Sequence, residues 1–174
     1  MAIMTVDVSV ACPTWDADLP QAAALAERAV RAAEAALPAR AGAYEVSVLL
    51  ADDALQRRLN REWRGHDRAT NVLAFPSGAE APAGGPETVR GLGDIVLAHG
   101  TVSREARRDG KTLAEHLSHL VVHGFLHLVG FDHEKDAAAA QMEALEVRVL
   151  HGLGIADPYV PRAAAPAASQ ATEP

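Results

Sequence analysis

Three histidines in the second half of the chain have the types and spacing of a metal site. They are His123, His127 and His133, in the segment HGFLHLVGFDH. His123 and His127 are four residues apart, so on a helix they share one face, with Cβ atoms about 5–6 Å apart. Gly130 stands where a left-handed cap would end that helix, and the chain can then bring His133 back toward the other two rings. Three neutral imidazoles suit Zn²⁺ and leave its fourth position to water, as in catalytic sites.

The spacing H-x-x-x-H-x-x-G-x-x-H also occurs in metzincin peptidases. Those enzymes carry a glutamate directly after the first histidine, where it acts as the general base, whereas this chain has Gly124. The sequence therefore favours a zinc hydrolase that takes its base from elsewhere over a peptidase. Two further histidines, His116 and His119, precede the cluster, and we expect them to be solvated or helix-capping side chains.

Arginines form the second feature that could do chemistry. Residues 56–68 contain five arginines and two acids, a local net charge of +3 in a chain whose formal charge is −7. Arg64 comes directly before Gly65, at the end of a predicted helix, so its side chain can project into a cleft. A second basic group occupies residues 104–111. Each basic segment alone is typical of a solvated helix face. Beside a zinc site, however, both segments favour binding of an anion, and phosphate is the usual one.

The composition narrows the class of protein. With 174 residues, of which 49% are hydrophobic and 22% charged, the chain suits one folded domain. The acidic balance argues against a general nucleic-acid coating protein, but it allows local binding of a few phosphates. We find no apolar run that could span a membrane and no signal peptide at the N-terminus. The single cysteine, Cys12, cannot form an internal disulfide, so we expect a cytoplasmic protein.

The elements that must position these residues follow from periodicity and caps. Alternating and β-branched segments predict strands at residues 5–11, 44–51, 70–75 and 93–99. Helical spacing and capping residues predict helices at residues 20–37, 52–63, 102–109, 113–129 and 135–151. Thr112 and Glu115 form a capping box before the fourth of these helices. We therefore predict one α+β domain over residues 1–160, with a small mixed sheet of about four strands packed with about five helices. We also predict a loop at 77–90 and a disordered tail at 161–174.

Three segments together resemble a known family. HGFLHLVGFDH, LNREWRGHDRATNVLAFP and LGDIVLAH are similar to motifs of the bacterial YbeY family of endoribonucleases, from about residue 44 to Tyr159. Ala69 departs from the pattern, since the family often has proline there. The resemblance implies a zincin-like fold and one zinc ion held by His123, His127 and His133. It also implies that Arg64 is required for activity and that the reaction is cleavage of single-stranded RNA. The implied role is maturation of the 3′ end of 16S rRNA and ribosome quality control, with the small subunit and its assembly factors as partners.

These expectations assign roles to named residues. Zinc would lower the pKa of its bound water toward about 7, and Arg64 would neutralise charge on the phosphoryl oxygens, so the catalytic candidates are Arg64 and His123. Asp132 is either an acceptor for an imidazole N–H or a turn-forming residue. The candidate RNA-binding residues are Arg57, Arg61, Arg64, Arg68, Arg107 and Arg108. Two other functions stay open: a zinc hydrolase of another substrate, and an assembly or RNA-binding factor in which zinc is mainly structural.

Overall fold

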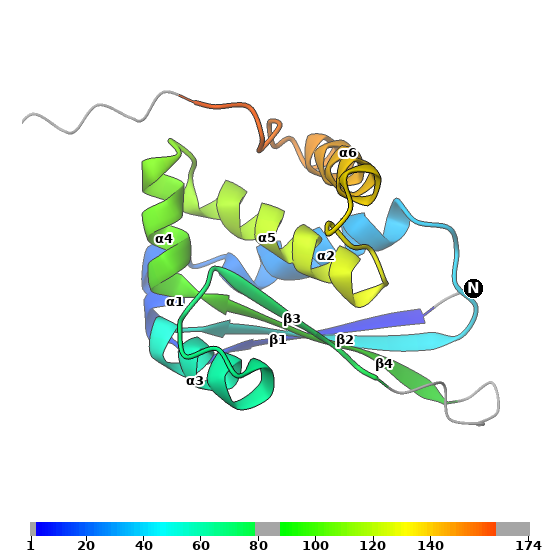
Figure 1. Ribbon diagram of the computed structural model, residues 1–174, viewed down its shortest axis with the longest axis horizontal. Coiled ribbons are helices and arrows are strands. Elements are labelled where there is room, and N and C mark those ends of the chain that lie inside the picture. Colours follow the sequence, from blue (N-terminus) through cyan, green and yellow to red (C-terminus); the bar gives the residue numbers. More distant parts are fainter. Residues whose placement is uncertain (1–2, 79–87, 163–174) are drawn as a thin grey trace, which may run out of the picture.

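The computed structural model describes residues 3–78 and 88–162, and its centre is a four-stranded mixed sheet (Figure 1). The strands are β1 (Ile3–Val10), β2 (Ala43–Ala51), β3 (Val72–Pro76) and β4 (Val89–Ala98), in the spatial order β1-β2-β4-β3. β1, β2 and β4 are parallel, and β3 runs antiparallel to β4 at the edge of the sheet. The predicted α+β class with about four strands is confirmed.

Helices cover the two faces of the sheet unequally. Those described are α1 (Pro13–Asp18), α2 (Ala22–Ala35), α3 (Asp53–Arg64), α4 (His99–Arg108), α5 (Leu113–Leu128) and α6 (Asp136–Gly152). α2 and α5 lie on one face with α6 outside them, while α3 lies on the other (Figure 1). The main core forms under α2 and α5, where Val46, Val48 and Leu50 of β2 meet Phe125 of α5, all at most 1% exposed.

The face on the α3 side is only partly covered. Leu55 and Leu59 of α3 pack against a small cluster that includes Val96 of β4. Away from α3, the same face carries exposed polar side chains, among them Asp7 and Ser9 of β1. This face of β1 is therefore solvated, and a large part of the sheet stays open on the α3 side.

The structure differs from the predicted elements at two places. α1 has no counterpart among the predicted helices, because six residues are too few to show helical periodicity. Its Trp15 is fully buried and donates a hydrogen bond from Nε1 to the carbonyl of Ala51, 2.9 Å away. β4 begins at Val89, inside the segment predicted as a loop, of which residues 79–87 lie outside the described residues.

Most of the predicted tail, residues 163–174, also lies outside the described residues. Within the described part, Arg162 donates hydrogen bonds to both carboxylate oxygens of Glu115, each 3.1 Å away. The described chain thus includes the first two residues of the predicted tail, 161 and 162. In the part that the structure describes, no helix is long and apolar enough to cross a bilayer.

Candidate metal centre

His123, His127 and His133 converge at the C-terminal end of α5, and their potential ligand atoms all lie within 4.8 Å of one another. The Nε2 atoms of His123 and His127 are 3.1 Å apart. Two nitrogens that bind one zinc ion tetrahedrally, each at about 2.0–2.1 Å, are about 3.3 Å apart. His123 and His127 are half-buried and His133 is exposed, so the cluster opens toward solvent. The donor set and its spacing fit a three-histidine metal site with one open position.

Local signals in the sequence bring the three rings together. α5 begins at the capping box of Thr112 and Glu115, in which both reciprocal hydrogen bonds are present. At the other end Gly130 adopts a φ of 100°, which side chains other than hydrogen strongly disfavour. Its backbone N–H bonds the carbonyl of His127, 3.1 Å away, and the chain turns back toward His133. The predicted cap at Gly130 and the predicted convergence are confirmed.

Gly124 lies where α5 packs closely against the sheet. A Cβ atom at this position would lie 2.9 Å from Cγ2 of Ile95 and 3.4 Å from Cγ2 of Val72. Because the interior is closely packed, α5 leaves no room here for a larger side chain. The position that holds the glutamate base of metzincins is therefore packed against the sheet in this protein, where it lines the metal cavity without a side chain that could act as a base.

A buried carboxylate on α6, Glu146, orients the ring of His123. Its Oε1 lies 2.5 Å from Nδ1 of His123, and the residue is 0% exposed. Oε2 accepts a hydrogen bond from the hydroxyl of Tyr159 and lies 3.4 Å from Nε2 of His119. Burial raises the pKa of the Glu146 carboxyl, but its polar contacts with His119, His123 and Tyr159 outweigh burial and lower the pKa to about 2. The ionised carboxylate accepts a hydrogen bond from Nδ1–H of His123 and so leaves Nε2 of that ring to bind a metal.

Arg64, the last residue of α3, lies at the same cavity. Gly65 ends α3 with a φ of 72°, so the chain turns away and leaves the arginine side chain projecting. Arg64 and the three histidines line a cavity of about 260 Å³. The guanidinium donates a hydrogen bond to the carbonyl of Ala74, and its Cζ lies 5.3 Å from the centre of the Phe75 ring. These contacts hold a cation at the edge of β3, on the wall of the metal cavity.

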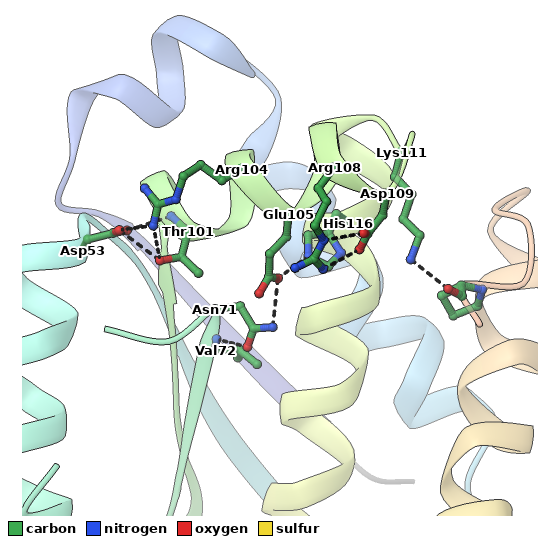
Figure 2. A network of polar contacts seen from close by, with 11 residues as sticks. Asp53, Asn71, Val72, Thr101, Arg104, Glu105, Arg108, Asp109, Lys111 and His116 are labelled. Atoms are coloured by element: carbon green, nitrogen blue, oxygen red, sulfur yellow. Dashed lines mark hydrogen bonds and ion pairs between the residues drawn. The ribbon is translucent and has the colours of Figure 1, made fainter. Parts of the chain in front are cut away.

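Asn71, which the sequence patterns do not single out, lines the same cavity. Its Nδ2 donates to Oε2 of Glu105 at 3.0 Å, and its Oδ1 accepts from the backbone N–H of Val72 at 2.7 Å. The same Glu105 oxygen lies 2.7 Å from Nε2 of His116, so one carboxylate joins α4, α5 and the start of β3 (Figure 2). His116 is 5% exposed, and the expectation of a solvated or capping side chain is wrong. Burial lowers the pKa of His116, although Glu105 opposes this effect.

Of the other candidate RNA-binding arginines, three lie on α3 or just after it. Arg57, Arg61 and Arg68 are exposed. Arg57 forms a two-pronged ion pair with Asp67, at 2.8 and 3.0 Å, which compensates part of its charge. The predicted cluster of arginines around α3 is therefore at the surface, and its member Arg64 lines the metal cavity.

Arg107 and Arg108 do not reach the metal centre. They end α4 beside the start of α5, and Arg108 pairs with Asp109 at 2.6 Å (Figure 2). His123 lies 11 residues after the N-cap of α5, Thr112, a rise of about 17 Å along the helix. Any RNA contact of these two arginines would therefore be made far from the histidines.

Of the two roles left open for Asp132, the structure shows that of a turn-forming residue. Its Oδ1 accepts a hydrogen bond from the backbone N–H of Glu134, 3.1 Å away, within the turn after α5. The short side chain is thus satisfied locally, and Glu146 of α6 is the acceptor for His123. One signal for Glu146 was present in the sequence: it lies four residues from Met142 and from Leu150, on the apolar face of a predicted helix, where an unpaired acid would be unfavourable.

The chain is similar to known proteins over most of its length. The sequence profile of a family described as endoribonuclease YbeY matches residues 10–154. The endoribonuclease YbeY of Bradyrhizobium sp. is 48% identical over 161 residues, which cover 92% of this chain and 95% of that protein. The endoribonuclease YbeY of Azorhizobium caulinodans is 53% identical over 158 residues, covering 90% and 96%.

The fold has a counterpart among solved structures. A Thermotoga maritima protein determined in solution superposes with a TM-score of 0.52, covering 86% of this chain and 92% of that one at 23% identity. At this identity the likeness is evidence for the fold alone, and it agrees with the predicted α+β class. From the match over most of its length, the chain belongs to the endoribonuclease YbeY family, a family of hydrolases.

Proposed function

We propose that this chain is a zinc-dependent endoribonuclease that hydrolyses single-stranded RNA. The observation that carries the proposal is the three-histidine cluster with Arg64 on the wall of the same cavity. A metal centre beside a fixed guanidinium suits a substrate that carries a phosphate. Family membership supports RNA as the source of that phosphate.

Some residues of the site would bind the metal, and another would stabilise negative charge on the substrate. His123, His127 and His133 would hold the ion, and when bound it supplies a water acidic enough to react near neutral pH. Glu146 fixes the tautomer and orientation of His123. Arg64 would bind a phosphoryl oxygen, and its attraction grows as negative charge builds on that oxygen during the reaction.

We further propose that the natural substrate is the 3′ end of immature 16S rRNA and that the chain acts in the cytoplasm with the small ribosomal subunit and its assembly factors. The arginines of α3, Arg57, Arg61 and Arg68, support the binding of an RNA backbone next to the cavity. The buried free thiol of Cys12 is consistent with a reducing compartment. The small cavity, about 260 Å³, suits a flexible single strand, whose phosphates can approach the site one at a time.

The test is RNA cleavage by the purified chain. A single-stranded RNA and its duplex form are incubated with the protein before and after removal of metal by a chelator, and again after zinc is restored. We expect cleavage of the single strand that is lost with the metal and regained with zinc. His127→Ala should abolish cleavage, while His151→Ala, which changes an exposed histidine of α6, should not.

Each other outcome has a clear meaning. Cleavage that survives both metal removal and His127→Ala would refute the metal-dependent mechanism. RNA binding without cleavage would favour an assembly factor with a structural zinc. For the natural substrate, the chain should trim a 16S precursor at its 3′ end, and failure to cut there would refute that part of the proposal.

A further inference from the structure

A second cavity lies on the other side of strand β3 from the histidines. It is a groove of about 730 Å³ on the sheet face that α3 leaves open, lined by side chains that include Asp7, Ser47, Phe75 and Asp94. Side chains alternate along a strand, so Val72 and Ala74 face the metal cavity while Phe75 faces the groove. The two cavities are therefore separated by the thickness of a single edge strand.

Arg64 and Pro76 line both cavities. β3 is the edge strand of the sheet, and the Arg64 side chain crosses its edge with one hydrogen bond to the carbonyl of Ala74 and its cation over the ring of Phe75. An RNA strand bound through a phosphate at Arg64 can therefore pass directly over the edge of β3 into the groove.

The groove offers surfaces for a nucleobase and few for a phosphate. Trp63, the residue before Arg64, lines it and is 74% exposed, which is unusual for so large an apolar side chain. Phe75 lies opposite Asp94 in the β3–β4 ladder, so an aromatic ring and a carboxylate are neighbours on this face. The carboxylates of Asp7 and Asp94 repel phosphates but accept hydrogen bonds from base amino groups. The groove therefore favours the base of a nucleotide over its backbone.

We propose that this groove binds the base of a nucleotide next to the phosphate held at Arg64, stacked on Trp63 and with its amino group hydrogen-bonded to Asp94. The inference rests on the proposed function, since it takes the ligand to be single-stranded RNA. It assigns a base-binding subsite to a sheet face outside the metal centre. It also predicts a preference for bases with an amino group over uracil, because an amino group offers the acceptor-only carboxylate two N–H donors and uracil offers a single one, at N3.

Tryptophan fluorescence tests the subsite directly. The chain has two tryptophans, and Trp15 is fully buried, so emission that RNA quenches reports on Trp63. A short single-stranded RNA is mixed with the protein in a stopped-flow instrument, so that binding is followed before cleavage. Copies of the RNA carry one abasic site, moved one nucleotide at a time. We expect quenching with the intact RNA and loss of quenching when one particular position is abasic.

Two substitutions of Trp63 distinguish stacking on an aromatic ring from contact with any large apolar side chain. Stacking of a base on an aromatic side chain is lost in Trp63→Leu, which should raise the dissociation constant about 5- to 150-fold. Trp63→Phe keeps an aromatic face and should stay within about fivefold of the unchanged protein. Because Trp63 is exposed, both variants should melt close to the unchanged protein, and this measurement guards against misfolding.

The outcomes separate the subsite from the proposed function. If the protein cleaves RNA, but RNA does not quench Trp63 and Trp63→Leu binds RNA with unchanged affinity, the subsite is refuted and the proposed endoribonuclease function is not. The groove would then be assigned to a protein segment instead of a base. Quenching and weakened binding in Trp63→Leu without cleavage would support the subsite and refute the nuclease. Equal quenching by oligouridine and by oligocytidine would overturn the role of Asp94.

Discussion

Replacing Glu146 by glutamine removes one negative charge beside His123 and leaves the shape of the side chain unchanged. The amide oxygen of glutamine can still accept the Nδ1 proton of His123, and its NH₂ group can donate to the hydroxyl of Tyr159, which accepts as well as donates. The imidazole thus keeps its orientation and loses only the charge that makes its Nε2 a stronger ligand. We therefore expect weaker metal binding by a correctly folded protein.

The size of the effect follows from which contacts survive. Changes to groups that support a metal-binding histidine weaken metal binding about 10- to 100-fold. Since Glu146→Gln keeps both hydrogen bonds, its zinc dissociation constant should rise about tenfold, or about 1.4 kcal/mol. Glu146→Ala loses the hydrogen bonds as well and should approach 100-fold, or about 2.7 kcal/mol. Tyr159→Phe removes one donor and leaves the charge, so its effect should stay below about tenfold.

The assay is a competition titration for zinc against a chelator of known affinity near neutral pH. The control is Glu143→Gln, which makes the same chemical change at an exposed position of the same helix. Denaturant unfolding of the metal-free proteins shows that each variant is folded. Equal zinc affinity in Glu146→Gln, Glu143→Gln and the unchanged protein would refute the role of Glu146 in orienting and charging the metal ligand.

Four further predictions concern the site and its surroundings. Arg64→Ala should lower the single-turnover rate constant about 100- to 1000-fold with a much smaller loss of RNA affinity, and Arg64→Lys should restore only part; a rate near normal would exclude catalysis by Arg64. Elemental analysis should find one zinc per chain, with binding that weakens in acid as the ligands protonate; protein purified gently and without any first-row metal would contradict this. Burial lowers the pKa of His116 in the folded protein, so below the ordinary histidine pKa of about 6.5 this residue binds a proton more readily in the unfolded chain. The free energy of unfolding of the metal-free protein should therefore fall from pH 7 to pH 5, and it should fall less in His116→Gln. Deleting residues 163–174 should leave the melting temperature unchanged, whereas a deletion that also removes Arg162, the partner of Glu115, should lower it.

The predicted part of the site is the part whose signals are local. The capping box at Thr112, the spacing of His123 and His127, and the glycine at 130 each act within a few residues, and together they determine where α5 begins, which rings share its face and where it ends. Arg64 followed by Gly65 is a local signal of the same kind. These residues could be placed before the structure because no distant contact is needed to interpret them.

The unpredicted part depends on contacts between distant segments. Glu146 follows His123 by 23 residues, and only the packing of α6 on α5 brings the carboxylate to Nδ1. Asn71 reaches the cavity because Glu105, 34 residues later, holds its amide. The sequence patterns could not indicate which acid serves the metal centre. The candidate that they offered, Asp132, is near His133 in the chain but is hydrogen-bonded within its own turn.

The contact between Tyr159 and Glu146 bears on how the protein is made. Proteins are synthesised from the N-terminus, and domains generally fold as units during that process. His123, His127 and His133 leave the ribosome first, the carboxylate that orients His123 follows on α6, and the tyrosine that holds the carboxylate comes last. The hydrogen bonds that support His123 are therefore complete only after Tyr159 has been synthesised. A nuclease with ribosomal RNA as its proposed substrate thus gains the last support of its metal centre after all three of its metal-binding histidines have been made.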